Sequence, residues 1–367
     1  MNKEPKPSVT SFQYLTVISG VLFANGIMSL PRVVASDAGR SAWLVVLAVG
    51  LVMSGITLLA DKLASEFPSQ DAAEWPKLLL GPILGRVWMS VYGLRAIALC
   101  LLTAQLYAGN LSLRLLHETP TYVFAIIILT LSLMAVLARI PGFTRYSEAA
   151  FFLSMPLILF VVIPFTKGNS VHLLPLIGDK PAEDLFKGAL AASYSYSGFD
   201  FLWFVYPYLQ HKASSKLWAS GAVLLATGVY TFVTATAVMF FGIEKLNIIF
   251  LPTLSILSGI EVVFFERIDS LMMFVWLSTI VTTAASQLYT ATRLTQGMSS
   301  RLSFAKTAAL LSGLLLIMAI NDIPIRQAVA FSDMFGVFDL SFIISSLLLF
   351  LFLASLRKGK GGTSPEK

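Results

Sequence analysis

The sequence VISGVLFANGIMSLPRVVASDAG at residues 17–39 is largely apolar, but it is interrupted where a membrane-spanning helix should be most apolar. Asn25 and Gly26 lie in its middle, and Pro31 follows the glycine by five residues. Interrupting a helix frees backbone N–H and C=O groups that lipid cannot satisfy, so protein, a ligand or an ion must satisfy them. This stretch therefore predicts a membrane helix that is broken in its middle.

A second stretch, GALAASYSYSGFDFLWFVYPYL at residues 188–209, shows the same pattern. Ser197, Gly198 and the carboxylate of Asp200 lie at its mid-depth, and Pro207 follows them. Small polar residues again occupy the place where lipid requires apolar ones. We expect a second broken helix here.

The two interrupted segments lie in corresponding positions, because each is the first helix of one half of the chain, about 10–167 and about 184–356. Such a pair is a strong sequence indication of a transporter-type site near the middle of the bilayer. The half-helix N-terminus beyond a break suits a carboxylate, and the freed carbonyls suit an ammonium group or a cation. In the alternative interpretation, the glycines only allow close helix packing and the prolines are kinks.

The composition is that of an integral membrane protein. Of 367 residues, 56% are hydrophobic and 13% are charged, whereas a soluble domain carries about a quarter charged residues. The mean hydropathy is +0.79. The single cysteine, Cys100, excludes a disulfide framework and a cysteine-based metal cluster, and three histidines leave little for a histidine site. The basic residues behind the net charge of +6 are spread along the chain, which argues against a nucleic-acid partner.

A hydrocarbon core about 30 Å thick requires about 20 apolar residues per helix. The runs that meet this requirement predict an all-α integral membrane protein with ten transmembrane helices in a single domain, residues 1–357. They lie near 12–35, 41–64, 86–112, 121–139, 144–166, 184–209, 215–242, 268–295, 303–320 and 328–355. Lys and Arg are more frequent in the loops on the side of the N-terminus, so we expect a multi-pass membrane protein with both termini in the cytoplasm.

Three further segments are expected to differ from these helices. Residues 66–85 mix tryptophan and leucine with charge, which predicts a short helix at the cytoplasmic interface of the lipid bilayer. Residues 246–264 are apolar but contain a proline and a glycine, which favours an extracellular re-entrant or surface helix over an eleventh span. Residues 358–367 predict a disordered cytoplasmic tail.

Charged side chains within a span need a partner, a proton or a water-filled cavity, because a charge at the bilayer centre costs roughly 3 kcal/mol on insertion scales. Asp200 is such a group, and Arg95 is a basic residue deep in the run at 86–112. A buried Arg95–Asp200 ion pair is one hypothesis. In the other, the Arg95 side chain extends toward the cytoplasmic interface.

Hydroxyl groups form a polar face on the run at 268–295, where Ser278, Thr282 and Thr283 recur at helical spacing with Ser286. These hydroxyls either help to coordinate an ion or ligand, or bond their own helix backbone. The sequence contains no phosphate-binding glycine loop, no HExxH motif and no plausible nucleophile–base pair. We therefore expect no catalytic residues, no metal, no cofactor and no enzymatic activity.

The chain resembles the spore germination permease family, the membrane-embedded B subunits of nutrient germinant receptors, within the amino acid–polyamine–organocation superfamily. The resemblance runs over about residues 10–356. The segments that carry it are GIMSLPR (26–32), FPSQDAAEWPKLLLGPILGR (67–86), RYSEAAFFLSMPLIL (145–159), LLPLIGDKPAEDLFKGAL (173–190), SGFDFLWFVYPYL (197–209) and FFERIDSLMMFVW (264–276). Their order and spacing together make the resemblance specific.

The resemblance implies a leucine-transporter-type fold, a five-plus-five inverted repeat in which helices 1 and 6 are broken. It implies a binding pocket for an amino acid or similar small nutrient between helices 1, 3, 6 and 8. By position, the implied ligand-binding residues are Ala24, Asn25, Gly26, Ile27, Tyr196, Ser197, Gly198, Phe199 and Asp200. The superfamily often has glycine at the position of Ala24, and the run at 144–166 lacks the mid-membrane lysine of some proton-coupled relatives.

Two functions from different classes follow from this resemblance. The first is a receptor subunit in the bacterial cell membrane or spore inner membrane, which binds a nutrient and signals germination to an A subunit and a lipoprotein C subunit. The second is an amino acid permease driven by protons or sodium, and a membrane scaffold with a vestigial pocket is a third interpretation. The family resemblance favours the receptor.

Overall fold

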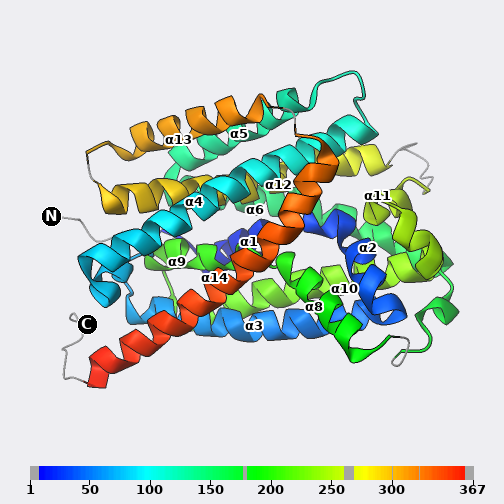
Figure 1. Ribbon diagram of the computed structural model, residues 1–367, viewed down its shortest axis with the longest axis horizontal. Coiled ribbons are helices and arrows are strands. Elements are labelled where there is room, and N and C mark those ends of the chain that lie inside the picture. Colours follow the sequence, from blue (N-terminus) through cyan, green and yellow to red (C-terminus); the bar gives the residue numbers. More distant parts are fainter. Residues whose placement is uncertain (1–7, 177–179, 260–267, 300, 322, 360–367) are drawn as a thin grey trace.

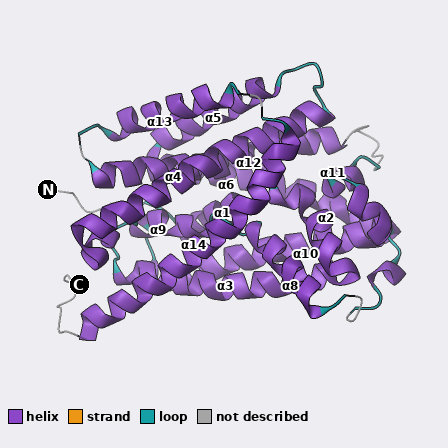
Figure 2. Cartoon of the chain, in the orientation of Figure 1, coloured by secondary structure: helices purple, strands orange, loops and turns teal. Residues whose placement is uncertain are grey.

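The computed structural model describes residues 8–176, 180–259, 268–299, 301–321 and 323–359. Within these ranges the chain forms helices joined by loops and turns, and it forms no β-strand (Figure 2). The α-helices are α1 (Ser11–Leu22), α2 (Gly26–Ala38), α3 (Ala42–Glu66), α4 (Trp75–Arg114), α5 (Thr121–Leu137), α6 (Arg139–Ile158), α7 (Val162–Lys167), α8 (Ala182–Tyr194), α9 (Leu202–Val205), α10 (Ser215–Ile248), α11 (Pro252–Leu257), α12 (Ile268–Met298), α13 (Phe304–Ala319) and α14 (Ile325–Gly359). Short 3-10 helices join them: η1 (Gly39–Ser41), η2 (Leu159–Val161), η3 (Ser170–Leu173), η4 (Phe199–Phe201), η5 (Tyr206–Tyr208) and η6 (Lys212–Ser214).

Each of the predicted runs corresponds to one helix or to a row of shorter helices flanking an interruption. Six stretches of the described chain are long and apolar enough to cross a membrane, which makes this a multi-pass membrane protein. The apolar helices α5 and α13 are shorter, so the number of ten crossings stays a prediction.

The first predicted break is present. α1 ends at Leu22 and α2 begins at Gly26, and Pro31 lies within α2. The chain between them is nonhelical, so the backbone groups of residues 21–25 need partners outside their own helix. The interruption that Asn25 and Gly26 predict is therefore present in the structure.

The second break is also present. α8 ends at Tyr194, and Gly198 adopts a left-handed conformation with φ of +102°, after which the chain continues as η4, α9 and η5. A Cβ atom at Gly198 would lie 2.6 Å from Cγ1 of Val21, which precedes the first break. The two breaks are therefore packed directly against each other, and glycine is required at position 198 by both conformation and space.

Two long helices organise the packing around the breaks. α12 packs against α4, α5 and α6, while α10 packs against α3, α1 and α2. Figure 1 shows α14 crossing obliquely over this bundle, where it contacts α3, α4 and α8. The broken helices thus lie inside a shell of continuous ones.

The segments between the spans partly follow the predictions. α4 begins with a short turn of helix that ends at Gly81, whose φ is +81°, so the expected short helix within 66–85 is present as the start of α4. α11 is a short helix within the expected segment 246–264, and residues 260–264 lie outside the described residues. The tail prediction is wrong at its first two positions because α14 continues to Gly359, and residues 360–367 lie outside the described residues.

Candidate ligand pocket and buried charge cluster

A cavity of about 450 Å³ extends from the two helix breaks to Asp37, at the C-terminal end of α2. We call this end of the bundle the Asp37 end. The residues that line it near the breaks and along the neighbouring helices include Asn25, Gly26, Ser29, Leu30, Leu106, Asn110, Leu190, Tyr194, Ser195, Val329, Ser332 and Val337. Arg32, Asp37, Lys187 and Phe250 also line it. Its volume lies within the range of about 300–1,000 Å³ that is usual for small-molecule sites.

The wall of this cavity differs from the predicted one in one helix. The resemblance implied helices 1, 3, 6 and 8, whereas the lining residues come from α2, α4, α8 and α14, with Phe250 and Leu251 from the loop before α11. The fourth wall is therefore the tenth predicted span and not the eighth. α14 takes this position because it crosses over α4 and α8, while α12 is packed behind α4.

Side chains, and not an open cavity, satisfy most of the carbonyl groups freed at the first break. The Thr283 hydroxyl donates to the carbonyl of Val21 at 3.1 Å, and the Tyr230 hydroxyl donates to the carbonyl of Leu22. Tyr230 also reaches the Ser195 carbonyl of the second break at 3.2 Å. These carbonyls were expected to suit an ammonium group or a cation, but they already have internal donors.

Asn25 is the exception at this break. Its Nδ2 donates to the carbonyl of Thr103 on α4 at 3.0 Å, which fixes the side-chain amide. Its Oδ1 is buried and has no hydrogen-bond partner in the described part of the chain. A buried acceptor without a donor costs about 1–3 kcal/mol, which makes Asn25 a candidate partner for a donor group, since the residue lines the inner end of the cavity.

The structure separates the predicted ligand-binding residues into two groups. Asn25 and Gly26 line the cavity. Ile27, Tyr196 and Phe199 are buried in the hydrophobic core, and Ala24 is partly buried, with its carbonyl 3.4 Å from Nε1 of Trp276. The direct ligand contacts assigned to these positions stay predictions.

Most hydroxyl groups of the predicted polar face on α12 donate to carbonyl groups of their own helix. The hydroxyl of Ser278 donates to Val275 at 2.7 Å, and that of Thr282 donates to Ser278 at 3.2 Å. Thr283 alone also reaches across to the first break. The local backbone bonds favour the structural interpretation of this face.

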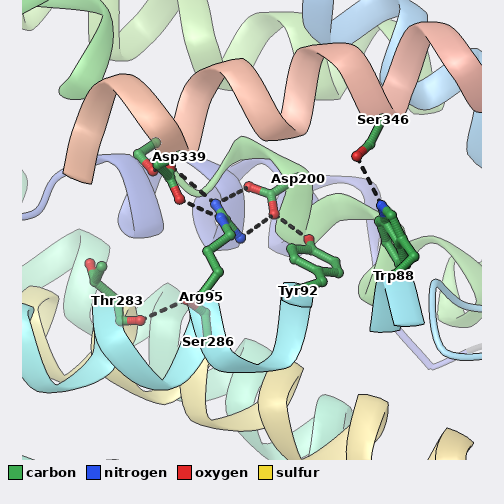
Figure 3. Close-up of polar contacts among 9 residues, drawn as sticks. Trp88, Tyr92, Arg95, Asp200, Thr283, Ser286, Asp339 and Ser346 are labelled. Atoms are coloured by element: carbon green, nitrogen blue, oxygen red, sulfur yellow. Dashed lines mark hydrogen bonds and ion pairs between the residues drawn. The ribbon is translucent and has the colours of Figure 1, made fainter. Parts of the chain in front are cut away.

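Three charged residues of the spans, Arg95, Asp200 and Asp339, meet in one buried cluster (Figure 3). Arg95 of α4 donates from Nη1 to Oδ2 of Asp200 at 3.0 Å, so the hypothesised ion pair is present and the interfacial alternative is wrong. Arg95 also donates from Nε to Oδ1 of Asp339 and from Nη2 to its Oδ2 at 3.2 Å. The Tyr92 hydroxyl donates to Asp200, and the Ser197 hydroxyl donates to Asp339. We call Arg95, Asp200 and Asp339 the charge cluster.

The charge cluster is closed to solvent. Arg95 and Asp200 are each 2% exposed and Asp339 is 1% exposed. The sequence reading missed Asp339, although an acidic residue within the run at 328–355 is a signal in itself. The cluster joins α4, the second break and α14, which are also walls of the cavity.

Aromatic side chains fill the bundle at the opposite end, near the start of α4. Trp75 lies with its ring centroid 5.5 Å from that of Trp203 and 4.8 Å from that of Phe350, and Trp88 packs 5.0 Å from Phe350. We call this the Trp75 end. There Arg293 also binds Asp71 with both Nε and Nη2 at 2.7 Å. Side chains from α4, α9, α12 and α14 therefore close this end beneath the charge cluster.

Comparison with known proteins agrees with this architecture. A family model described as "Spore germination protein" matches residues 8–328. Spore germination protein YndE of Bacillus subtilis (strain 168) is 21% identical over 295 residues, which are 78% of this chain and 80% of that protein. Spore germination protein A2 of the same organism is 22% identical over 371 residues, which are 97% of this chain and 98% of that protein.

Among solved structures, the chain is similar to Mhp1, a nucleobase-cation-symport-1 family transporter in a closed conformation with bromovinylhydantoin bound. The TM-score is 0.71 with 11% identity, over 97% of this chain and 81% of that one. This likeness shows a fold of the leucine-transporter type, as the family resemblance implied. Because the family model matches most of its length, the chain belongs to the spore germination permease family.

Proposed function

We propose that this chain is the membrane subunit of a spore nutrient germinant receptor, and that it binds an amino acid or similar small nutrient in the cavity at the Asp37 end. In this proposal it has no enzymatic activity, its termini are cytoplasmic, and it signals to an A subunit and a lipoprotein C subunit in the spore inner membrane. The observation that carries the proposal is the cavity that reaches both helix breaks in a member of this family.

The cavity has the groups that an amino acid requires. The free Oδ1 of Asn25 is placed to accept a hydrogen bond from an ammonium group. The first turn of α2, which begins at Gly26, presents the positive end of a helix dipole to a carboxylate. Leu30, Leu190 and Val337 supply apolar surface for a side chain. A zwitterion with a modest apolar side chain complements all three features.

An amino acid permease is the second candidate, and the similarity to a transporter structure favours it. The two functions share the pocket and differ in whether the ligand crosses the membrane. Counterflow of labelled amino acid in proteoliposomes separates them, because a permease exchanges its substrate and a receptor subunit does not.

The test is a thermal-shift screen of the detergent-purified chain against the twenty amino acids, with nucleosides and sugars as controls. A ligand at 100 times its dissociation constant stabilises the folded state by about 2.7 kcal/mol if it binds only that state. We expect a selective shift with one or a few amino acids. A chain that responds to no amino acid would contradict the proposal for the isolated subunit.

A cavity-filling variant locates the binding. Gly26 is unsuitable, because any Cβ there would lie 2.7 Å from Oγ of Ser195 and disturb the break itself. Ser29 is partly exposed to the cavity, so Ser29→Trp fills it with less strain. Ser345→Trp, on an exposed face of α14, is the matched control. The shift should disappear in Ser29→Trp and persist in Ser345→Trp, whereas equal shifts would place the ligand elsewhere.

A further inference from the structure

The charge cluster contains more negative than positive groups. Arg95 is its single cation among the described residues, and it faces the two carboxyl groups of Asp200 and Asp339. If both carboxyl groups were ionised, the cluster would carry a net negative charge in a place closed to solvent. Burying an unbalanced charge is strongly unfavourable, and a buried group escapes this penalty by neutralising itself.

We propose that the charge cluster is a proton-binding site, in which one proton on the carboxyl group of Asp200 or of Asp339 makes the cluster neutral with Arg95. The proton protonates one carboxylate to the carboxylic acid, and Arg95 pairs with the carboxylate that remains. No other covalent change is involved. This goes beyond nutrient binding, because it assigns a second ligand, the proton, to a second place in the chain.

The surroundings leave the proton as the neutralising species. The titratable or charged side chains that face the cluster, in the part of the chain described, are Tyr92 and Arg95 of α4, Asp200 of η4 and Asp339 of α14. Tyr92 donates to Asp200 as a neutral hydroxyl and brings no positive charge. The Ser197 hydroxyl is likewise a neutral donor.

The cluster lies where a proton can influence both ends of the bundle. Asp339 follows the cavity-lining Val337 by two residues on α14, and Ser197 follows the cavity-lining Ser195 by two residues at the second break. With the proton bound, the cluster is neutral and holds α14 to α4 and to the break. Loss of the proton leaves two ionised carboxylates in one buried site, and their mutual repulsion loosens this junction.

The direct test is infrared spectroscopy of the detergent-purified full chain, titrated from about pH 5 to about pH 8, the range in which folded proteins are usually most stable. A protonated buried carboxyl group gives a carboxylic acid C=O stretching band, which shifts when the buffer is exchanged to heavy water. We expect this band in the wild-type protein at neutral pH. A wild-type spectrum without this band across the range would overturn the proposal.

Substitutions assign the band. Asp339→Asn and Asp200→Asn each remove one carboxylate, so Arg95 is balanced without a proton and the band should be lost in both variants. The cluster variants are compared in an Asp61→Asn background, because Asp61 is another fully buried carboxyl group, on α3, that contacts the hydroxyls of Tyr14 and Ser215 at 3.3 and 2.8 Å and would contribute a band of its own. The band of the cluster should persist in Asp61→Asn alone. A band absent from Asp61→Asn, or as intense in both cluster variants as in Asp61→Asn alone, would overturn the proposal.

This test is independent of the nutrient, since no amino acid is added. A failed infrared result leaves the thermal-shift screen unaffected, and a failed screen leaves the infrared result unaffected. Wild-type spectra recorded in sodium chloride and in choline chloride distinguish a proton from a metal cation. A band that sodium abolishes at constant pH would show that a sodium ion replaces the proton, and would overturn the assignment of the proton as the resident ligand.

Discussion

Arg95 donates two hydrogen bonds to the carboxylate of Asp339, a residue that lies 244 positions later in the chain. The bonds join the third and tenth predicted spans at the depth of the second break, where Asp200 accepts two further hydrogen bonds from the same guanidinium. One side chain thus connects three elements whose order in the sequence gives no indication that they meet. The stability of the bundle should depend strongly on it.

Replacing Arg95 with methionine should destabilise the protein by about 3–5 kcal/mol, because it leaves two buried carboxyl groups without their cation. Denaturation of the purified chain in detergent measures this loss. Asp339→Asn should cost less, because Asp200 still balances Arg95 and an amide oxygen still accepts. An Arg95→Met variant as stable as the wild-type protein would contradict the role of this residue as the centre of the cluster.

The second break requires a glycine at position 198. Gly198→Ala should destabilise the protein by about 1–3 kcal/mol, because its φ of +102° is strained for alanine and the new methyl group would meet Val21. Gly228→Ala on α10 is the matched control, since nothing lies within 4 Å of its Cβ position. The control should be neutral or stabilising by about 0.5–1 kcal/mol. Melting temperatures of the two variants compare them directly.

Thr283→Val should destabilise the protein at the first break by about 1–3 kcal/mol. It removes the hydroxyl group that donates to the carbonyl of Val21, and so leaves this buried carbonyl without a donor. Thr282→Val should have little effect, since its hydroxyl bonds a carbonyl within its own helix. Chemical denaturation measures the difference. Equal losses in the two neighbours would mean that the contact with Val21 is not important for stability.

The carboxyl group of Glu74, in the segment before α4, should make stability depend on pH. Burial raises the pKa of Glu74, and the negative charge of nearby Asp71 raises this pKa further. The folded protein therefore binds this proton more tightly than the unfolded chain. Its contribution to stability is fully present below the ordinary pKa of a glutamate and is lost as the pH rises through the raised pKa.

Glu74→Gln should remove this part of the pH dependence and raise the melting temperature above that of the wild-type protein at neutral pH. Asp71→Asn is the contrasting variant, because Asp71 binds Arg293 through Nε and Nη2 and also accepts from the backbone N–H of Ala73. It should destabilise the protein by about 1.5–3 kcal/mol. A Glu74→Gln variant whose pH profile matches the wild type would contradict the assignment to Glu74.

The sequence was sufficient to place both breaks. Asn25 with Gly26, and Ser197 with Gly198, are small and polar where lipid requires apolar residues, and this contrast is visible without any structure. The helix ranges could be predicted for the same reason, because the long apolar runs are also visible in the sequence. Helix α14 was placed as a span, and the presence of Asp339 within it could have been recognised as well.

The sequence was not sufficient to show which helices form the pocket wall. The contacts of Asp339 with Arg95, and of Ser332 with the cavity, depend on how α14 crosses the bundle. Apolar surfaces that face lipid and those that face other helices have the same composition, so hydrophobicity does not identify neighbours within a membrane. The internal satisfaction of the freed carbonyls by Tyr230 and Thr283 likewise required coordinates.

Helix α14 passes the cavity, the charge cluster and the aromatic packing at the Trp75 end. Ser332 lies at the cavity, Asp339 lies in the charge cluster, and Ser346 accepts a hydrogen bond from Nε1 of Trp88 at 2.9 Å beside the aromatic packing of Phe350. It runs from Ile325 to Gly359 without a proline, so it is a stiff rod about 50 Å long. Because no proline interrupts the helix between Ser332 and Phe350, a displacement of α14 at the cavity would also move the side chains that it places in the charge cluster and in the aromatic packing.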